Sequence, residues 1–580
     1  IATKSLNHHD LSCNHITSSD FFALRPVYIH EMMPKEKINI KMSTFARLDP
    51  LFKPVFGSCK FVNRAFFVPM RVIQKNWNEF ITQSVVNDGN TPWVPRETAY
   101  FTLQQWFTFI CKKTGADYNY VTKKTSVTTG EHYDFYISTA FGSVEVGYYT
   151  YNPYGRRIIT IMHSLGYSFD TLYAPNSESL HISALPLFAF YKLWIDWYSS
   201  SQYIQTTTFE NLFSNMGNNI GASGLSIIFE RLFGVEYEKD YFTSAWNNPV
   251  GPTNVNAFGE VLSTINDPTL VTSNGFSAGE TSQLRVTSDN SPYIAQGEQQ
   301  IFTLSQYFVD ALKAATDYVK RKQLAGVRAM DRYLAQWGIR LSDEKLKRSV
   351  YLGKHEVNVE IADVMNTTAY SDPSSPALGD YSGKGISFGN GSISYRTDEA
   401  GYLVVLSVLL PHVGYYDGLL RQNMHTKPLD FFTPEFDRLG TQPIAALELK
   451  TLDRQDSIAW GTAAGFTADD VFGFTSRYAE YKCSRDFMSG NMRLYPEQYD
   501  VFHFMRKIGN TDHVISQNFL TRDQSQFNRV FADTSNNLDH LQTVFRFKVD
   551  SYSPASKMFD DYEFDGGNTT QITVDGTRFD

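Results

Sequence analysis

The sequence predicts an all-β protein, a sandwich or barrel with long loops and a few helices. Short stretches with strand patterning recur along the chain, and proline and glycine separate them. Aromatic residues make up 15% of the chain, which suits half-buried strands and large protein contact surfaces. Helical periodicity is confined to two or three places. This combination favours a sandwich or barrel over an α/β enzyme.

The clearest strand pattern lies between residues 37 and 69. At 37–42, isoleucine and methionine alternate with lysine and asparagine, as in a strand with one buried face. A second strand is predicted from Cys59 to Val68, and it ends at Pro69 because proline cannot donate a hydrogen bond to a neighbouring strand. Residues 1–35 precede both strands and are expected to form a polar N-terminal arm.

Helical patterning begins at 183–198. Ser183 suits the N-cap, Pro186 suits the first turn, and apolar residues follow at helical spacing, so we expect a buried amphipathic helix. A second helical region is predicted to begin at Thr303 with a capping box, and a further helix to end at Gly338.

Further strands are predicted on both sides of these helices. Residues 112–180 are rich in Tyr, Thr, Val and Gly and are expected to be a β-rich insertion of hairpins, with a turn at Asn152-Pro153. Beyond residue 380 the predicted strands contain 386–388, 402–410 and 444–449.

The whole chain, 1–580, is expected to form one β domain with two exposed excursions. Residues 247–300 contain few charges and many turn-forming residues, so we predict an exposed surface insertion. Residues 551–580 end in clustered aspartates and are expected to be an acidic C-terminal arm.

No catalytic constellation is found. The sequence contains no phosphate-binding loop, no HExxH motif and no GxSxG motif. The glycine-rich segment 383–388 lacks a third glycine and is expected to be a loop, not a dinucleotide site. Carboxylates such as Asp398 and Glu399 are not brought together by any pattern. We therefore predict no enzyme activity, no catalytic residues and no cofactor.

Metal-ligand residues and cysteines are weighed separately. Several residues of ligand type occur near the N-terminus: His8, His9, Asp10, Cys13 and His15. Their spacings match no usual zinc pattern, so no metal site is predicted. The segment is expected to precede the first strand. The four cysteines have no CxxC spacing and are expected to be reduced and buried: Cys13, Cys59, Cys111 and Cys483.

Charge is unevenly distributed. The formal net charge is −9, which argues against coating of nucleic acid by bulk electrostatics. Residues 313–348 nevertheless hold ten basic and four acidic residues, a local charge of +6 that suits either a phosphate-facing surface or a solvated helix face. Apolar stretches are too short for a membrane span, so we expect a soluble, unexported protein without membrane insertion.

Seven segments together resemble the major capsid protein of microviruses, and they are most similar to the gokushovirus type. They follow the family's order over nearly the whole chain: 37–81, 183–198, 239–246, the helix from Thr303 leading into 351–353, 401–419, 430–444 and 472–482.

This resemblance implies an eight-stranded antiparallel jelly roll with long inter-strand insertions. It also implies that sixty copies form a T=1 icosahedral shell, which assembles in the bacterial cytoplasm and packages single-stranded DNA in the virion. The implied partners are further copies of the chain, the DNA genome, a small basic DNA-packaging protein, other virion or scaffolding proteins, and the host cell surface.

Two sets of site residues follow for such a protein. Basic residues and two tyrosines of the second helical region are predicted to face the DNA: Lys320, Arg321, Lys322, Arg328, Arg332, Tyr318 and Tyr333. The insertion 247–300 is predicted to contact the host through residues that include Asn247, Phe258 and Phe276. The alternatives are a flexible loop without a role and a loop that pairs with a neighbouring subunit within the shell wall.

A β-sandwich carbohydrate-binding protein or glycosidase remains an alternative, since its binding face would also be rich in Tyr and Trp. The mass of the native particle separates a shell from a glycan-binding monomer.

Overall fold

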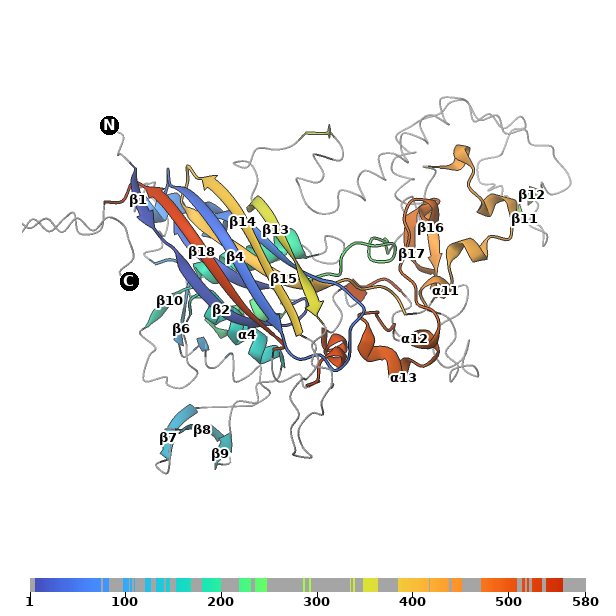
Figure 1. Cartoon of the computed structure of the whole chain (residues 1–580). Coiled ribbons are helices and arrows are strands. Elements are labelled where there is room, and N and C mark those ends of the chain that lie inside the picture. The colour runs from blue at the N-terminus through green and yellow to red at the C-terminus, as the bar shows by residue number, and fades with distance from the viewer. Residues whose placement is uncertain are drawn as a thin grey trace, which may run out of the picture.

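The computed structural model describes residues 6–74, 77–82, 97–103, 105–106, 109, 120–126, 132–139, 142–146, 153–167, 180–199, 219–230, 235–247, 285–286, 292–293, 334, 337–339, 348–362, 384–416, 418–437, 441–450, 471–508, 514–516, 519–520, 524–534 and 539–556. This part of the chain is mostly antiparallel β-structure with a few helices, as the sequence predicts (Figure 1).

Nine strands form the main sheet. Their bounds are β1 Asn7–Asp10, β2 Cys13–Ser19, β3 Arg25–Met32, β4 Lys37–Leu48, β5 Cys59–Pro69, β13 Val350–Ala362, β14 Lys384–Arg396, β15 Gly401–Pro411 and β18 Leu541–Ser553.

All strands of this sheet pair antiparallel, in the order β1-β18-β4-β14-β13-β5-β15-β3, and β2 also pairs with β18. Strand β13 joins two halves of the sheet, because Val350–Val359 pairs with β5 whereas Glu360–Ala362 pairs with β14. The strands nearest the two chain ends are neighbours, with Asn7 opposite Ser553.

The two halves pack face to face over one apolar core. Strands β4 and β18 contribute Ile40 and Phe547, and strands β5 and β15 contribute Phe67 and Leu403. In β18 buried residues alternate with more exposed ones, because only one face of that strand meets the core. The period-2 prediction for residues 37–42 is confirmed by the same alternation in β4.

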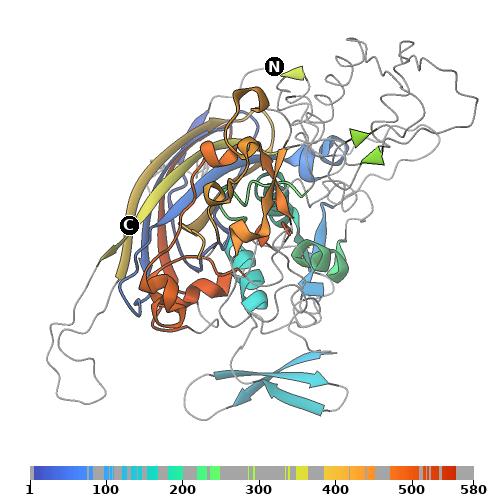
Figure 2. The ribbon, with the colours of Figure 1, turned by 90° about the vertical axis from the view of Figure 1, so that its right-hand side faces the viewer.

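Helices cover the second face of the β5–β15 half (Figure 2). Side chains of α4 (Pro153–Ser164), α5 (Leu185–Leu193) and α7 (Gly221–Glu230) share a second core with Phe66 and Val404. All eleven residues of β15 are consequently buried, which explains why its sequence is almost entirely apolar, interrupted by Ser407, and shows no alternation.

The helix predicted at 183–198 is present, with two differences. Pro186 lies in the first turn as predicted. The N-cap is Ala184 and not Ser183, although Ser183 Oγ accepts a hydrogen bond from Leu185 N at 3.3 Å. The helix is buried as predicted, but it is not amphipathic, because every residue of α5 except Pro186 is buried between the sheet and other helices. Even Lys192 is buried, and its ammonium group pairs with Asp196 at 2.8 Å.

The insertion at 112–180 contains the predicted hairpins and a helix. Strands β7 Tyr120–Ser126, β8 His132–Thr139 and β9 Gly142–Val146 form a three-stranded antiparallel sheet. The turn predicted at Asn152-Pro153 is instead the start of α4, where proline occupies the first helical position.

Three further predictions of local structure are wrong. The histidine-rich N-terminal segment does not precede the first strand, because it forms β1 and β2, which pair with β18. Segment 383–388 is no loop, because β14 begins at Lys384. The strand predicted at 444–449 ends at Ala445 and continues as helix α11 (Ala446–Leu449).

The remaining elements are short. They are α1 Met70–Ile73, α2 Trp77–Thr82, β6 Tyr100–Thr102, β10 His181–Ser183, the π-helical turn Trp194–Tyr198, β11 Arg285–Val286, β12 Pro292–Tyr293, β16 Thr441–Ala445, β17 Val471–Ser476, α12 Asn491–Leu494, α13 Pro496–Tyr499 and the 3₁₀ turns Arg421–Met424, Pro428–Asp430, Pro434–Phe436, Ala479–Tyr481, Asp500–Phe502 and Gln524–Val530.

Candidate assembly surface

A second, smaller unit lies beside the sandwich and is built on the β16–β17 hairpin (Figure 1). We call it the hairpin module; it comprises the described residues of 235–247, 411–450 and 471–520. Its own apolar core packs Phe242 edge-on against Tyr415 and Phe472, with ring centroids 4.7 and 5.9 Å apart. The module is therefore a folded platform and not a loose set of loops.

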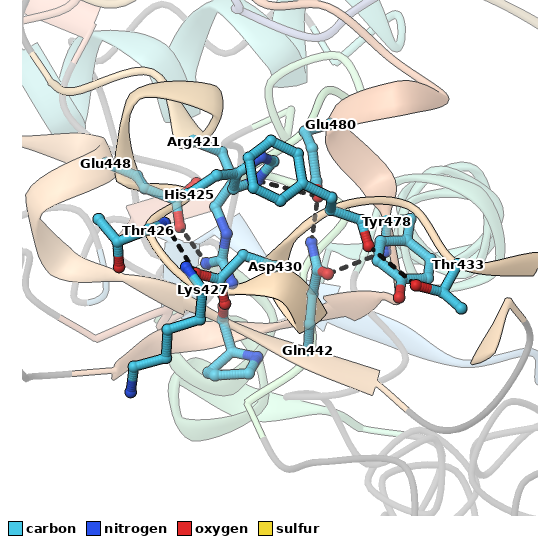
Figure 3. Close-up of polar contacts among 12 residues, drawn as sticks. Arg421, His425, Thr426, Lys427, Asp430, Thr433, Gln442, Glu448, Tyr478 and Glu480 are labelled. Atoms are coloured by element: carbon cyan, nitrogen blue, oxygen red, sulfur yellow. Dashed lines mark hydrogen bonds and ion pairs between the residues drawn. The ribbon is translucent and has the colours of Figure 1, made fainter.

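A buried carboxylate ties the loops of the module together (Figure 3). Glu448 is 1% exposed and accepts hydrogen bonds from Arg421 Nη1 at 2.7 Å and Tyr241 Oη at 2.8 Å. It also accepts one from Ala445 N at 3.0 Å. Burial and the nearby Glu448 charge raise the pKa of Tyr241, so its hydroxyl stays protonated and donates. This network fixes the segment that follows Arg421.

Two further contacts shape the same loops (Figure 3). Gln442 donates to Glu480 Oε2 at 2.6 Å and accepts from Tyr478 N at 2.8 Å, so it bridges two parts of the module. Asp430 Oδ2 accepts from the backbone N–H groups of Thr426 and Lys427 at 2.9 and 2.8 Å, and these bonds lower its pKa. The carboxylate therefore holds the turn closed while it is ionised.

These polar contacts present a group of aromatic rings, which we call the aromatic cluster: His425, Phe431, Phe432, Tyr478 and Tyr481. Phe432 lies 5.1 Å from Tyr478 and 5.7 Å from Tyr481, measured between ring centroids. The His425 ring lies 5.4 Å from Phe431. The cluster is thus continuous across two loops that are far apart in the sequence.

Much of the cluster faces water. Phe431 and Tyr481 are each 53% exposed and Phe432 is 44% exposed. A contiguous apolar surface of this kind is typical of a protein contact site, and aromatic residues are enriched at the centre of such interfaces. The arrangement can bind another protein surface.

The described residues include no group of three or more His, Cys, Asp and Glu side chains that could hold a metal ion. The N-terminal histidine-rich residues have other contacts. His8 Nε2 lies 3.1 Å from Asp550 Oδ1, and His15 Nδ1 lies 2.8 Å from the carbonyl oxygen of Val27. None of the described helices is long and apolar enough to cross a membrane.

The predicted DNA-facing residues fall outside the described residues: Lys320, Arg321, Lys322, Arg328, Arg332, Tyr318 and Tyr333. Arg348, the last cation of the basic stretch, is described and has a structural contact. Its guanidinium lies 4.0 Å from the Trp197 ring centroid and donates to Asp196 O at 3.1 Å. This cation therefore supports the end of the buried helix.

Of the predicted host-contact residues, Asn247 is described and exposed, whereas Phe258 and Phe276 lie outside the described residues. The aromatic cluster was not predicted from sequence. Its signal is the group of three phenylalanines and one proline at 430–436, which contributes to the family resemblance but does not reveal which rings are exposed.

The cysteine prediction holds only in part. Cys59 is buried, and burial raises the pKa of its thiol. Cys13 is half-buried, and Cys483 is exposed, so the prediction of burial is wrong for Cys483. Cys111 lies outside the described residues.

Comparison with known proteins identifies the family. A family model described as "Capsid protein (F protein)" matches residues 2–111 and 163–559, and the unmatched residues 112–162 include β7, β8 and β9. The chain is 23% identical over 531 residues to capsid protein VP1 of Chlamydia phage 1, covering 85% of each chain.

Two further relatives are VP1 proteins of other phages. The chain is 22% identical over 434 residues to capsid protein VP1 of Spiroplasma virus 4, covering 67% of this chain and 76% of that protein. It is 22% identical over 516 residues to capsid protein VP1 of Bdellovibrio phage phiMH2K, covering 83% of this chain and 82% of that protein. The chain therefore belongs to the capsid protein (F protein) family and is a structural protein of a bacteriophage virion.

Proposed function

We propose that this capsid protein self-assembles into a T=1 icosahedral shell of sixty copies and that the aromatic cluster is one of the contacts between copies. The observation that carries the second part is a continuous group of half-exposed rings held on a rigid, hydrogen-bonded platform. A closed shell buries such surfaces in repeated, symmetric contacts.

We also propose that the sandwich is an eight-stranded jelly roll. If β1 and β2 are counted as one interrupted strand, the sheet divides into two sets of four, β1/β2-β18-β4-β14 and β13-β5-β15-β3. Numbered along the chain, these are strands 1-8-3-6 and 5-4-7-2, the order of two interlocked Greek keys in viral coats. The long connections between strands then become the insertions that form the shell surface.

The proposed cargo is a single-stranded DNA genome, which the basic residues of 313–348 contact with the help of a small basic packaging protein. The +6 charge of that stretch supports this, because the chain as a whole is negative. Residues 247–300 are proposed to face the host cell surface, and exposed Asn247 marks where that segment begins. Assembly is proposed to occur in the host cytoplasm, with other virion or scaffolding proteins assisting.

The assembly contact is tested by replacing the two adjacent phenylalanines with serine, F431S together with F432S. Loss of a central aromatic contact raises the protein concentration needed for assembly by about tenfold or more. Particle mass and negative-stain images measure this, and circular dichroism establishes that the subunit is folded.

Phe45 provides the matched control, because it is 45% exposed but lies on the outward face of β4, away from the cluster. We expect F45S to assemble like the natural protein. Normal shells from the double variant, or an equal defect in F45S, would contradict the assigned contact.

A further inference from the structure

The outer face of one half of the sandwich carries exposed basic side chains. This half contains β1/β2, β18, β4 and β14, and the helices lie on the opposite side of the sandwich (Figure 1, Figure 2). No described element covers its outer face, where the side chains that point outward are exposed or half-exposed. Six cations from three adjacent strands lie here, and we call them the basic face: Lys37, Lys41, Arg47, Arg396, Arg546 and Lys548.

The strand register places like charges next to each other on this face. Lys548 of β18 lies directly opposite Lys41 of β4, and Arg396 of β14 lies directly opposite Lys37 of β4. Residues in such positions point to the same side of the sheet, with Cβ atoms about 5 Å apart. Like charges at this spacing destabilise a sheet, so each pair favours an anion placed between the two cations.

Two carboxylates lie on the same face at the β1 edge, and both have donors of their own. Asp550 Oδ1 lies 3.1 Å from His8 Nε2. Asp10 accepts hydrogen bonds from the backbone nitrogen and the hydroxyl of Ser12. These bonds are the main cause of the lowered pKa of Asp10, and the charges of His8 and Lys548 contribute less. Neither carboxylate comes within ion-pair distance of a cation of the basic face.

A third carboxylate, Asp49, follows the end of β4 and accepts a hydrogen bond from Gln542 Nε2 at 2.6 Å. Cations therefore outnumber carboxylates on this face by six to three. Among the residues that the structure describes, none of the six cations forms an ion pair or a side-chain hydrogen bond. The face consequently presents accessible, unneutralised positive charge.

Small polar residues lie between the cations. Ser392 is opposite Lys41 on β14, and Ser43 is opposite Arg546 on β4. Such short side chains leave room above the sheet, and their hydroxyl groups can donate to phosphate oxygens. Arg546 and Lys548 are alternate residues of one strand, so they lie about 7 Å apart along it. A flexible chain of phosphates can therefore meet several cations at once.

We propose that the basic face binds the phosphate backbone of single-stranded DNA and that Lys41 and Lys548 share one phosphate. This inference rests on the proposed DNA cargo and adds a contact surface separate from residues 313–348. A phosphate accepts charge-assisted hydrogen bonds from both ammonium groups and so removes the repulsion between them. Phosphate contacts carry no sequence information, so binding should not depend on the base sequence.

The test measures binding of the purified full chain to a fluorescent oligodeoxythymidylate of about 20 nucleotides, by anisotropy at several salt concentrations. K41Q together with K548Q should lower the affinity by about tenfold. The slope of log affinity against log salt should become less steep by about 1.4, because two phosphate contacts are lost. The melting temperature of this double variant should not fall, since the substitutions remove a repulsion.

Lys53 and Lys427 provide the matched control, because both are exposed and lie outside the basic face. K53Q together with K427Q removes the same charge from the chain, so long-range attraction changes equally. Its affinity for the oligonucleotide should change by less than about twofold, since distant exposed charges are screened.

Lysine acetylation followed by mass spectrometry locates the bound strand. The oligonucleotide should protect Lys41 and Lys548 and leave Lys53 reactive. Unprotected Lys41 and Lys548, or equal affinities of the two double variants, would overturn the basic face as a DNA contact and leave residues 313–348 as the proposed one. A natural chain that binds no oligonucleotide would overturn both. Displacement of the oligonucleotide by polyglutamate at equal charge concentration would assign the face to an acidic protein segment and also overturn the proposal.

Discussion

At the scale of single residues, His503 couples the fold to pH. Its side chain is buried, and Nδ1 accepts a hydrogen bond from Met505 N at 3.2 Å, which requires an unprotonated nitrogen. Burial and the adjacent Arg529 charge lower the pKa of His503 to about 4. The unfolded chain, with a histidine pKa near 6.5, therefore takes up the proton first as the pH falls. The free energy of unfolding should decrease between pH 6.5 and 4.

We predict that this linkage removes about 2 kcal/mol of stability between pH 7 and pH 5. H503Q keeps an acceptor for Met505 N but does not titrate, so its unfolding free energy should depend less on pH. Urea unfolding at both pH values measures the difference. H163Q replaces an exposed histidine of α4 and should retain the natural pH dependence. A pH dependence in H503Q as steep as that of the natural chain would show that another group is responsible.

Burial also decides what an ion pair contributes. Arg421–Glu448 and Lys482–Asp437 both have a nitrogen–oxygen distance of 2.7 Å, but the Glu448 side chain is 2% exposed whereas that of Lys482 is 43% exposed. E448Q removes the buried charge that pairs with the Arg421 guanidinium, whose side chain is 23% exposed, and should cost about 3 kcal/mol. K482Q removes a screened surface pair and should cost less than about 1 kcal/mol. Denaturant titration of both variants checks this, and equal costs would contradict it.

At the scale of elements, two glycines allow the cost of an unfavourable backbone angle to be compared with the cost of a steric clash. Gly418 and Gly338 have φ values of +111° and +66°, so both occupy the region that other residues avoid. A Cβ at Gly418 would overlap the carbonyl oxygen of Glu448, whereas one at Gly338 would meet nothing within 4 Å. We predict that G418A destabilises the chain by about 2–4 kcal/mol and G338A by about 1 kcal/mol, measured by thermal unfolding. Similar losses of stability in the two variants would mean that the backbone angle alone, and not the steric clash, sets the cost.

Gly338 also shows how a local signal becomes structure. The sequence predicts a helix that ends there, and Gly338 N donates to Leu334 O at 2.9 Å. Pro186 is a second local signal of this kind, because it was expected in the first turn of a helix and lies in the first turn of α5. Such signals are reliable because a cap or a first-turn proline acts within one turn of backbone.

At the scale of the whole molecule, the sandwich is closed by strands from opposite ends of the chain. Strand β18 pairs with β1, β2 and β4 and contributes Phe545, Phe547 and Val549 to the core between the sheets. Removal of residues 541–580 should therefore abolish cooperative unfolding, because it exposes that core. Removal of residues 557–580, which follow β18, should leave a cooperative transition. Circular dichroism during heating measures both, and a cooperative transition in the longer truncation would refute this role of β18.

The sequence by itself determined the β class, the strands at 37–42 and 59–68, a helix within 183–198 and the family resemblance. Each depends on periodicity, capping or motif order, and these are properties of neighbouring residues or of their order along the chain. Tertiary structure alone decided that the polar segment 7–19 forms strands, because its partner β18 lies more than 500 residues away. It also decided that α5 is buried on all sides and that Phe431 and Phe432 are exposed. Burial depends on which surfaces the fold brings together, and no local pattern contains that information.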